Sequence, residues 1–379
     1  MLISLAMKLN HIVGTWFLLL VTGSVFAQVD VEYIGHASFV VESPAGVRVV
    51  IDPFNSNRWL GYRYPESVEA DLVLVTHPHY DHDASYYWGE SVPVFREPGE
   101  YRFRDVTLLG VEGKHADPYG KDFAQKNTIW LIEVGGLRIA HIGDNGPLTA
   151  ANVEALGRVD VLMLPADGDD HILKPEAITA ARRDLNDPLV IPMHYRLGGF
   201  LDLPRSLGPI DPWLENQEGV VRLDSNRALL TRERDASRKV LVFRPSPDLE
   251  VWSEGIVRGW QLLDEARSMM ANHPNQMSEV GALVRQAAES AECIAFKFNW
   301  ARVLAQSGDA KGAVAVLETA LARAGRGDWQ NRMQARSLLA ELYAKDGRVD
   351  EAVAQHRIVL QNSYRTELLE KARTYLASR

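Results

Sequence analysis

The chain has 379 residues, of which 46% are hydrophobic and 24% are charged, a composition that is ordinary for a globular protein with room for two domains. Its formal net charge of -9 argues against nucleic acid or an anionic membrane surface as the main partner. A small anionic substrate is not excluded, because bound dications would reverse the local field. The single cysteine, Cys293, excludes an intrachain disulfide.

The first 27 residues have the pattern of an export signal. Lys8 precedes an apolar core at 12–21, and Val25-Phe26-Ala27 fits the small-x-small rule for cleavage. This core is shorter than the roughly 20 residues that a membrane span needs, which favours a cleaved signal peptide. An uncleaved membrane anchor is the alternative. We therefore expect residues 1–27 to be a signal peptide and the mature protein to be periplasmic or secreted.

Apolar runs then predict strands in succession, followed by strands that alternate with helices. We expect strands at 29–34, 37–42, 47–51, 72–76, 92–95, 101–103, 106–111, 128–134, 137–142, 159–164 and 189–193, and helices at 148–156 and 175–184. Strand-like pieces at 219–223 and 239–243 are assigned to the edge of the same domain. Two packed sheets with helices outside would satisfy this order, which makes residues 28–245 one domain.

A boundary is expected at Arg244-Pro-Ser-Pro247, and residues 252–379 have a helical period that predicts an all-α domain. Residues 301–314 align with residues 340–353, each as a helix, a glycine turn and a second helix. The matching positions are Gly308 with Gly347 and Ala313 with Ala352. This pattern resembles the tetratricopeptide repeat, with residues 260–292 as a degenerate third unit. Such a stack either binds a protein partner or serves as a cap that stabilises the first domain.

Four metal-capable side chains follow the strand at 72–76 within six residues, and they are the strongest functional signal in the chain. They are His77, His79, Asp81 and His82. Neutral imidazole and carboxylate are ligands that zinc and other first-row dications accept. In an extended segment His77 and His79 point the same way, and after a bend Asp81 and His82 can face a second position. One loop can therefore begin two metal sites.

Further ligand types are expected if that loop binds metal. His115, Asp144 and His194 each stand at the end of a predicted strand. A sheet gathers strand ends along one edge, so these residues are candidates to complete the two sites.

With these residues in view, the chain resembles the metallo-β-lactamase-fold hydrolases over about residues 29–245. The motif Thr76-His-Pro-His-Tyr-Asp-His82 carries the resemblance. The segments at 33–39, 50–54 and 192–195 are similar to the subgroup that contains ascorbate-6-phosphate lactonase. The resemblance implies an αββα sandwich, so the expected class is α+β, followed by the all-α helical-repeat domain.

The resemblance also implies how the ligands are shared between two ions. It puts His77, His79 and His115 on the first ion, Asp81, His82 and His194 on the second, and Asp144 on both. Two divalent ions, with zinc favoured over manganese or iron, would supply a bridging hydroxide as the nucleophile. Asp81 can also orient that nucleophile.

Other candidates surround this set. Asp52, at a strand end, can hold the second ring nitrogen of a ligand histidine. His36 can do the same or contact substrate, with a structural role as the alternative. His171 can donate a proton to the leaving group or be a solvated loop residue, and Tyr195 can contact substrate or pack in the core.

These observations predict an exported, dinuclear metal-dependent hydrolase that cleaves an ester, lactone or phosphoester bond in a small molecule. The alternative is a metal-binding scaffold with little turnover, whose helical domain recruits a protein partner.

Overall fold

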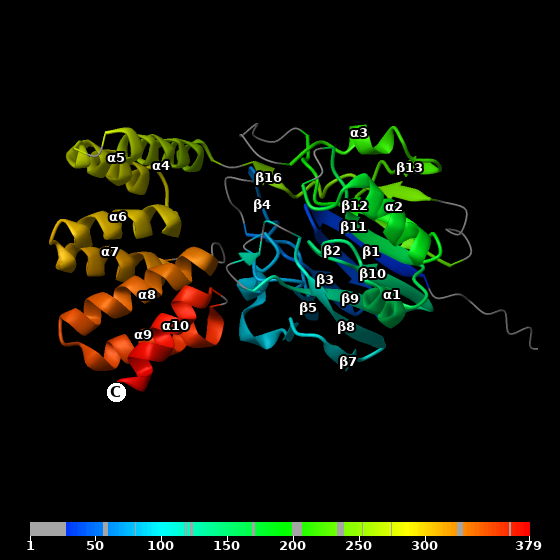
Figure 1. Cartoon of the computed structure of the whole chain (residues 1–379), viewed down its shortest axis with the longest axis horizontal. Helices are drawn as coiled ribbons and strands as arrows, with labels where there is room; N and C mark the ends of the chain where they lie inside the picture. The colour runs from blue at the N-terminus through cyan, green and yellow to red at the C-terminus, as the bar shows by residue number, and fades with distance from the viewer. Residues whose placement is uncertain are drawn as a thin grey trace, which may run out of the picture.

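The computed structural model describes residues 28–55, 60–79, 81–116, 118, 120–121, 124–168, 171–198, 207–232, 239–251, 253–273, 275–323, 329–363 and 365–379. The predicted signal peptide, residues 1–27, lies outside them. Two packed β-sheets are followed by a stack of helices (Figure 1). Among the described helices, none combines the length and the apolar composition needed to cross a membrane.

The first sheet has six strands in the order β14-β1-β2-β3-β5-β6. Their bounds are β1 (Val29–Gly35), β2 (Ser38–Glu42), β3 (Arg48–Ile51), β5 (Leu72–Leu74), β6 (Val94–Phe95) and β14 (Arg227–Leu230). The first three strands pair antiparallel, whereas β3, β5 and β6 run parallel. A 3-10 helix, η1 (Ser85–Ser91), connects β5 to β6 after the metal-capable loop.

The second sheet has eight strands in the order β13-β15-β12-β11-β10-β9-β8-β7. Their bounds are β7 (Gly99–Phe103), β8 (Val106–Lys114), β9 (Lys126–Val134), β10 (Leu137–His141), β11 (Val161–Pro165), β12 (Leu189–Met193), β13 (Val220–Arg222) and β15 (Val240–Val242). β8, β10, β11 and β12 run in one direction, so their carboxyl ends meet at one edge of the sheet.

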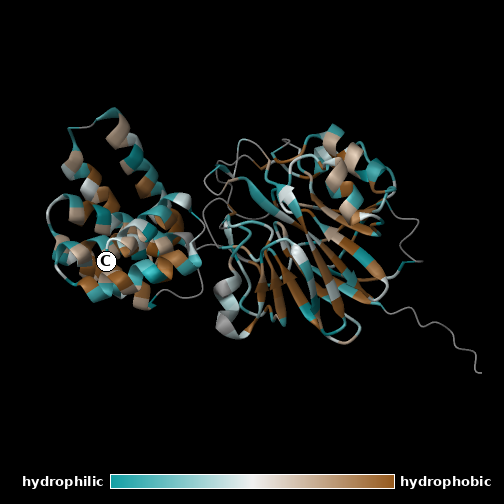
Figure 2. Cartoon of the chain, turned by 60° about the horizontal axis from the view of Figure 1, so that its bottom comes forward, coloured by the Kyte–Doolittle hydropathy of each residue, from teal (hydrophilic) through white to brown (hydrophobic). Residues whose placement is uncertain are grey.

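One hydrophobic core joins the two sheets, and Figure 2 shows apolar residues concentrated along their strands. The indole of Trp130 on β9 donates across to the carbonyl of Val75, which follows β5, at 3.0 Å. Three helices belong to this part: α1 (Ala150–Leu156), α2 (Pro175–Asp184) and α3 (Asp211–Leu214). The helix α1 has a Thr149 capping box and contacts β8. The predicted sandwich is confirmed.

Every strand and helix predicted between residues 29 and 193 has a counterpart, but five short elements were not expected. These are β14, η1, α3, and a separate antiparallel pair formed by β4 (Tyr62–Arg63) and β16 (Glu250–Val251). Through β16 the chain stays paired with β4 up to Val251, beyond the proline pair that marks the predicted boundary. The hydroxyl of Ser67 also donates to Asp248, at 2.8 Å.

The described residues from 253 onwards form seven helices: α4 (Glu254–Asn272), α5 (Met277–Ser290), α6 (Ile294–Gln306), α7 (Ala310–Arg323), α8 (Trp329–Lys345), α9 (Val349–Asn362) and α10 (Thr366–Ala377). Each packs on the next in the chain, and together they form the stack on the left of Figure 1. Gly308 and Gly347 both have positive φ, at 92° and 78°. Ala313 and Ala352 are both fully buried. The aligned positions thus share conformation and burial, in an arrangement that resembles tetratricopeptide folds.

Candidate metal centre

The loop after β5 turns tightly, which directs its polar side chains inward. The backbone N–H groups of His82 and Asp83 both donate to the carbonyl of His79, at 3.0 and 2.8 Å. His77, Asp81 and His82 are almost completely buried, although polar groups are rarely buried without partners. The loop is therefore built around an interior site rather than solvated.

The structure brings the predicted ligands together in two groups, in each of which the candidate ligand atoms lie within 4.8 Å of one another. The first group contains His77, His79, His115 and Asp144. The second contains His36, Asp81, His82 and His194. Because β8, β10 and β12 end at one edge of the second sheet, His115, Asp144 and His194 meet the loop from the first sheet there. His36 is the one member of these groups that the resemblance had not placed on an ion.

Asp144 lies between the two groups. Its Oδ2 atom is 3.6 Å from His115 Nε2 and 3.1 Å from His194 Nε2. Its Oδ1 atom is 3.3 Å from His82 Nε2. One carboxylate thus faces histidines of both groups.

The second ring nitrogen of three histidines is held by the protein. His82 Nδ1 donates to Asp52 Oδ2 at 2.8 Å, as the sequence had suggested. His115 Nδ1 donates to the carbonyl of Ala116 at 2.9 Å, and His77 Nδ1 lies 3.0 Å from Thr76 Oγ1. These contacts leave Nε2 of each ring to face Asp144, the tautomer that a metal ligand needs.

Thr76 and Asp52 are hydrogen-bonded to each other and to the ligand candidates His77 and His82. Asp52 accepts from the backbone N–H and the hydroxyl of Thr76, both at 2.7 Å, in addition to His82. Asp52, His36 and His194 all have positive φ, at 44°, 54° and 61°. Such conformations are strained for residues other than glycine and are typical of functional sites.

Two residues fix the Asp144 loop, and neither was a site candidate from sequence. Gly143 has φ of 55°, and a Cβ atom there would lie 2.4 Å from Thr76 Oγ1. Asn145 is buried, and its Oδ1 accepts from the backbone N–H of Lys114 at 2.8 Å and from Asn127 at 3.2 Å. Asn145 therefore ties the Asp144 loop to the strand end that carries His115. The only available signal was adjacency to Asp144.

Burial and charge set the protonation of the centre. Burial lowers the pKa of His79 to about 4 and takes the pKa of His77 well below its usual range. Burial opposes charge on His82 too, yet Asp144, Asp81 and Asp52 raise its pKa well above the usual value. For Asp144, burial favours the neutral acid, but His194 and His82 hold its pKa well below the usual range.

These residues fit divalent metal ions. His82 Nε2 and Asp144 Oδ1 are buried and have no hydrogen-bond partner among the described residues. A cation between them would satisfy both, and imidazole with carboxylate is a common donor set for zinc, iron and manganese. The carboxylates are ionised and the His77 and His79 imidazoles neutral, as metal binding requires, and a bound cation would replace the proton that the carboxylates favour on His82.

Of the two remaining candidates, His171 lies beside the candidate metal centre and Tyr195 lies in the core. The ring of His171 stacks on that of His194, with centroids 5.6 Å apart and planes inclined by 11°. Asp167 accepts from the backbone N–H of His171 at 3.0 Å and so fixes its loop. Tyr195 is buried, its hydroxyl pairs with Tyr33, and burial raises its pKa to about 12. This environment favours the packing interpretation of Tyr195.

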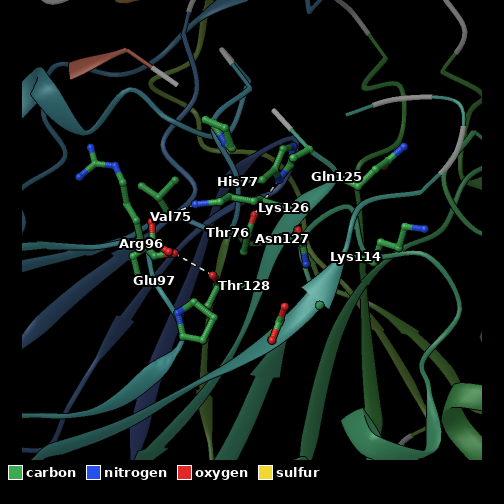
Figure 3. A pocket seen from close by; sticks show the side chains of 15 residues that line it. Val75, Thr76, His77, Arg96, Glu97, Lys114, Gln125, Lys126, Asn127 and Thr128 are labelled. Atoms are coloured by element: carbon green, nitrogen blue, oxygen red, sulfur yellow. Dashed lines mark hydrogen bonds and ion pairs between the residues drawn. The ribbon is translucent and has the colours of Figure 1, made fainter. Parts of the chain in front are cut away.

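A cavity of about 480 Å³ adjoins the centre and shares His77 with it. Its walls come from the ends of β5, β6 and β8 and from the start of β9 (Figure 3). The hydroxyl of Thr128 donates to the carbonyl of Arg96 across one side, at 2.7 Å. The size is in the range of small-molecule pockets.

Comparison with known proteins gives a consistent result. The model of the β-lactamase superfamily domain matches residues 30–194. A UPF0173 metal-dependent hydrolase of Pelotomaculum thermopropionicum is 31% identical over 195 residues, which is 44% of this chain and 83% of that protein. Another, from Thermus thermophilus, is 30% identical over 192 residues, covering 44% and 84%.

A solved structure from Thermotoga maritima is described as a Zn-dependent hydrolase of the metallo-beta-lactamase superfamily. It is 29% identical, covers 57% of this chain and 100% of that chain, and has a TM-score of 0.45. With its sandwich fold, its His and Asp groups, the matching domain model and the two UPF0173 relatives, the chain belongs to the metallo-β-lactamase superfamily, among relatives of the UPF0173 metal-dependent hydrolases.

Proposed function

We propose that this metal-dependent hydrolase uses two divalent ions to cleave an ester, lactone or phosphoester bond. The observation that carries the proposal is the position of Asp144 between two groups of buried histidines and carboxylates. A site for a single ion would need only one of these groups.

In this proposal His77, His79 and His115 hold the first ion, Asp81, His82 and His194 hold the second, and Asp144 contacts both. When bound, the ions would supply an activated water and polarise the attacked bond. The protein contributes fixed ligand tautomers, through Asp52, Thr76 and the carbonyl of Ala116, and burial that excludes bulk water. His-rich ligation favours zinc, with manganese or iron as alternatives.

An anionic substrate is supported by two lysines. Lys114 and Lys126 stand directly opposite each other in the pairing of β8 with β9, and both line the cavity. Like charges in that position are unfavourable. Glu97 offsets part of this charge, at 3.7 Å from Lys126, and a carboxylate or phosphate of the substrate would offset more. His171, stacked on His194 beside the second group, is the candidate to contact the leaving group.

We also propose export through the leader and a role in protein recruitment for the helical region. The leader pattern supports the first, and the stacked helix pairs support the second. The periplasm or the exterior is then the place of action.

The test is metal analysis of the purified full chain together with a screen of ester, lactone and phosphodiester substrates. We expect two metal equivalents, with activity that falls more than about 100-fold in Asp144→Ala, because ligands matter at least as much as their outer partners. The control is Asp224→Ala, at an exposed aspartate that pairs with Arg244.

Retention of both metal equivalents and of activity in Asp144→Ala would rule out the two-ion centre. No hydrolysis across the panel, together with capture of a partner that depends on residues 252–379, would favour the scaffold alternative.

A further inference from the structure

His36 reaches the centre from a different part of the fold than the other candidates. It stands in the turn between β1 and β2, and its side chain is fully buried. Its Nε2 atom lies 3.0 Å from Asp81 Oδ2. This oxygen is also the one that faces the second group, at 3.6 Å from His82 Nε2 and 3.8 Å from His194 Nε2.

The backbone fixes the His36 ring in this place. The carbonyl of His36 accepts from the backbone N–H of His194 at 2.9 Å and from the hydroxyl of Tyr33 at 3.0 Å. The φ of 54° turns the side chain inward at a conformational cost. The imidazole ring then lies 4.1 Å from that of His194. The β1–β2 turn and the end of β12 are thus joined at the second group.

Two chemical roles are available to His36, and the geometry distinguishes them. The separation of 3.0 Å between His36 Nε2 and Asp81 Oδ2 is the usual length of an N–H···O hydrogen bond. A carboxylate can only accept, so Nε2 carries the N–H of this contact and offers no lone pair to an ion.

We propose that His36 is a positioning residue, whose Nε2–H donates to Asp81 Oδ2 and holds this carboxylate toward His82 and His194. It is not a fourth ligand of the second ion. The inference rests on the proposed two-ion centre and deepens it, because a residue of the first sheet then sets affinity at one of the two ions.

The test uses two amide variants that differ only in reach. The amide nitrogen of His36→Gln extends to the position of Nε2, whereas that of His36→Asn stops near Nδ1. Amides are poor zinc ligands compared with imidazole, so only a hydrogen-bonding role is restored by glutamine. His356→Gln is the control, at a buried histidine of α9 whose ring contacts that of Tyr375. Thermal unfolding verifies that each variant folds.

Zn²⁺ titration by calorimetry, and absorption spectra after Co²⁺ substitution, measure each ion separately. We expect His36→Asn to weaken only one of two binding events, by about 10- to 100-fold, and His36→Gln to restore most of that affinity. Equal losses in both variants would overturn the positioning role in favour of direct ligation. Two unchanged binding events in His36→Asn would also overturn it. If the wild-type chain binds fewer than two ions, the proposed function fails before His36 is tested.

Discussion

The sheets and the helical stack bury different kinds of residue. Among the described residues between 28 and 251, the buried polar groups include eight histidines and aspartates that meet at one sheet edge: His36, Asp52, His77, Asp81, His82, His115, Asp144 and His194. Among the described residues of α4–α10, the buried polar groups are Ser337, His356 and Ser363. The cores of that stack consist of alanine and larger apolar residues. In the sheets, the unfavourable burial of charged and polar groups is accepted because these groups form the candidate metal centre. In the helical stack, burial serves the packing of apolar side chains.

Metal removal should separate the two parts most strongly. Chelation is expected to lower the melting temperature of the sheets, because each ion at 100 times its dissociation constant stabilises the folded state by about 2.7 kcal/mol. The helical stack should melt unchanged. Calorimetry with and without chelator measures this, and an equal shift of both parts would show that they unfold together.

Gly143→Ala should have the next largest effect, at about 2–4 kcal/mol of unfolding free energy, together with weaker metal binding. The new methyl group would meet Thr76 and Asn127, and φ is positive there. Gly136→Ala is the matched control, since its φ is 80° and no atom lies within 4 Å. That change should cost about 1 kcal/mol and leave metal content intact. Equal losses of unfolding free energy in the two variants would show that the contact of the new methyl group with Thr76 and Asn127 is not the cause.

Ala313→Leu should destabilise the helical stack by about 1–3 kcal/mol through overpacking and leave metal content unchanged. Ala310→Leu, at the exposed start of the same helix, should change stability by less than about 0.5 kcal/mol. Denaturant unfolding and metal analysis check both. Loss of metal in Ala313→Leu would show that the stack supports the centre.

The smallest expected effects test the equivalence of the two repeat copies. Gly308→Ala and Gly347→Ala should each cost about 1 kcal/mol, because both positions have positive φ and open space. Denaturant midpoints provide the measurement. A difference above about 0.5 kcal/mol would mean that the two turns, although aligned in sequence, have different surroundings.

Local signals predicted most of the sheets and the cluster of metal-capable residues. The loop after β5 carries its residue types within six positions, and strand ends converge by topology, so His115, Asp144 and His194 were accessible from periodicity. What could not be predicted depends on pairing between distant segments. β14 lacks β-branched residues and is a strand because it pairs with β1. The contact between His36 and Asp81 spans 45 residues, and no local pattern encodes it.

The same limit applies to side-chain direction. Tyr195 adjoins His194 in sequence, yet the two side chains serve different surroundings, because one lines the centre and the other packs against Tyr33. Asn145 is a second example, because its side chain holds the Asp144 loop only through bonds to Lys114 on β8 and Asn127 on β9. These bonds depend on strands that are distant in sequence.

The pair formed by β4 and β16 is the first strand pairing to resist a force that pulls on the carboxyl-terminal helices along the backbone. A force that runs along the backbone from α4 reaches β16 at Val251, where it meets a ladder of two residue pairs, Glu250 with Arg63 and Val251 with Tyr62. We expect this short ladder to separate under a lower force than the longer strand pairs of the two sheets. A partner that pulls on the helical stack would therefore leave the strands that carry Asp144 and His194 in place.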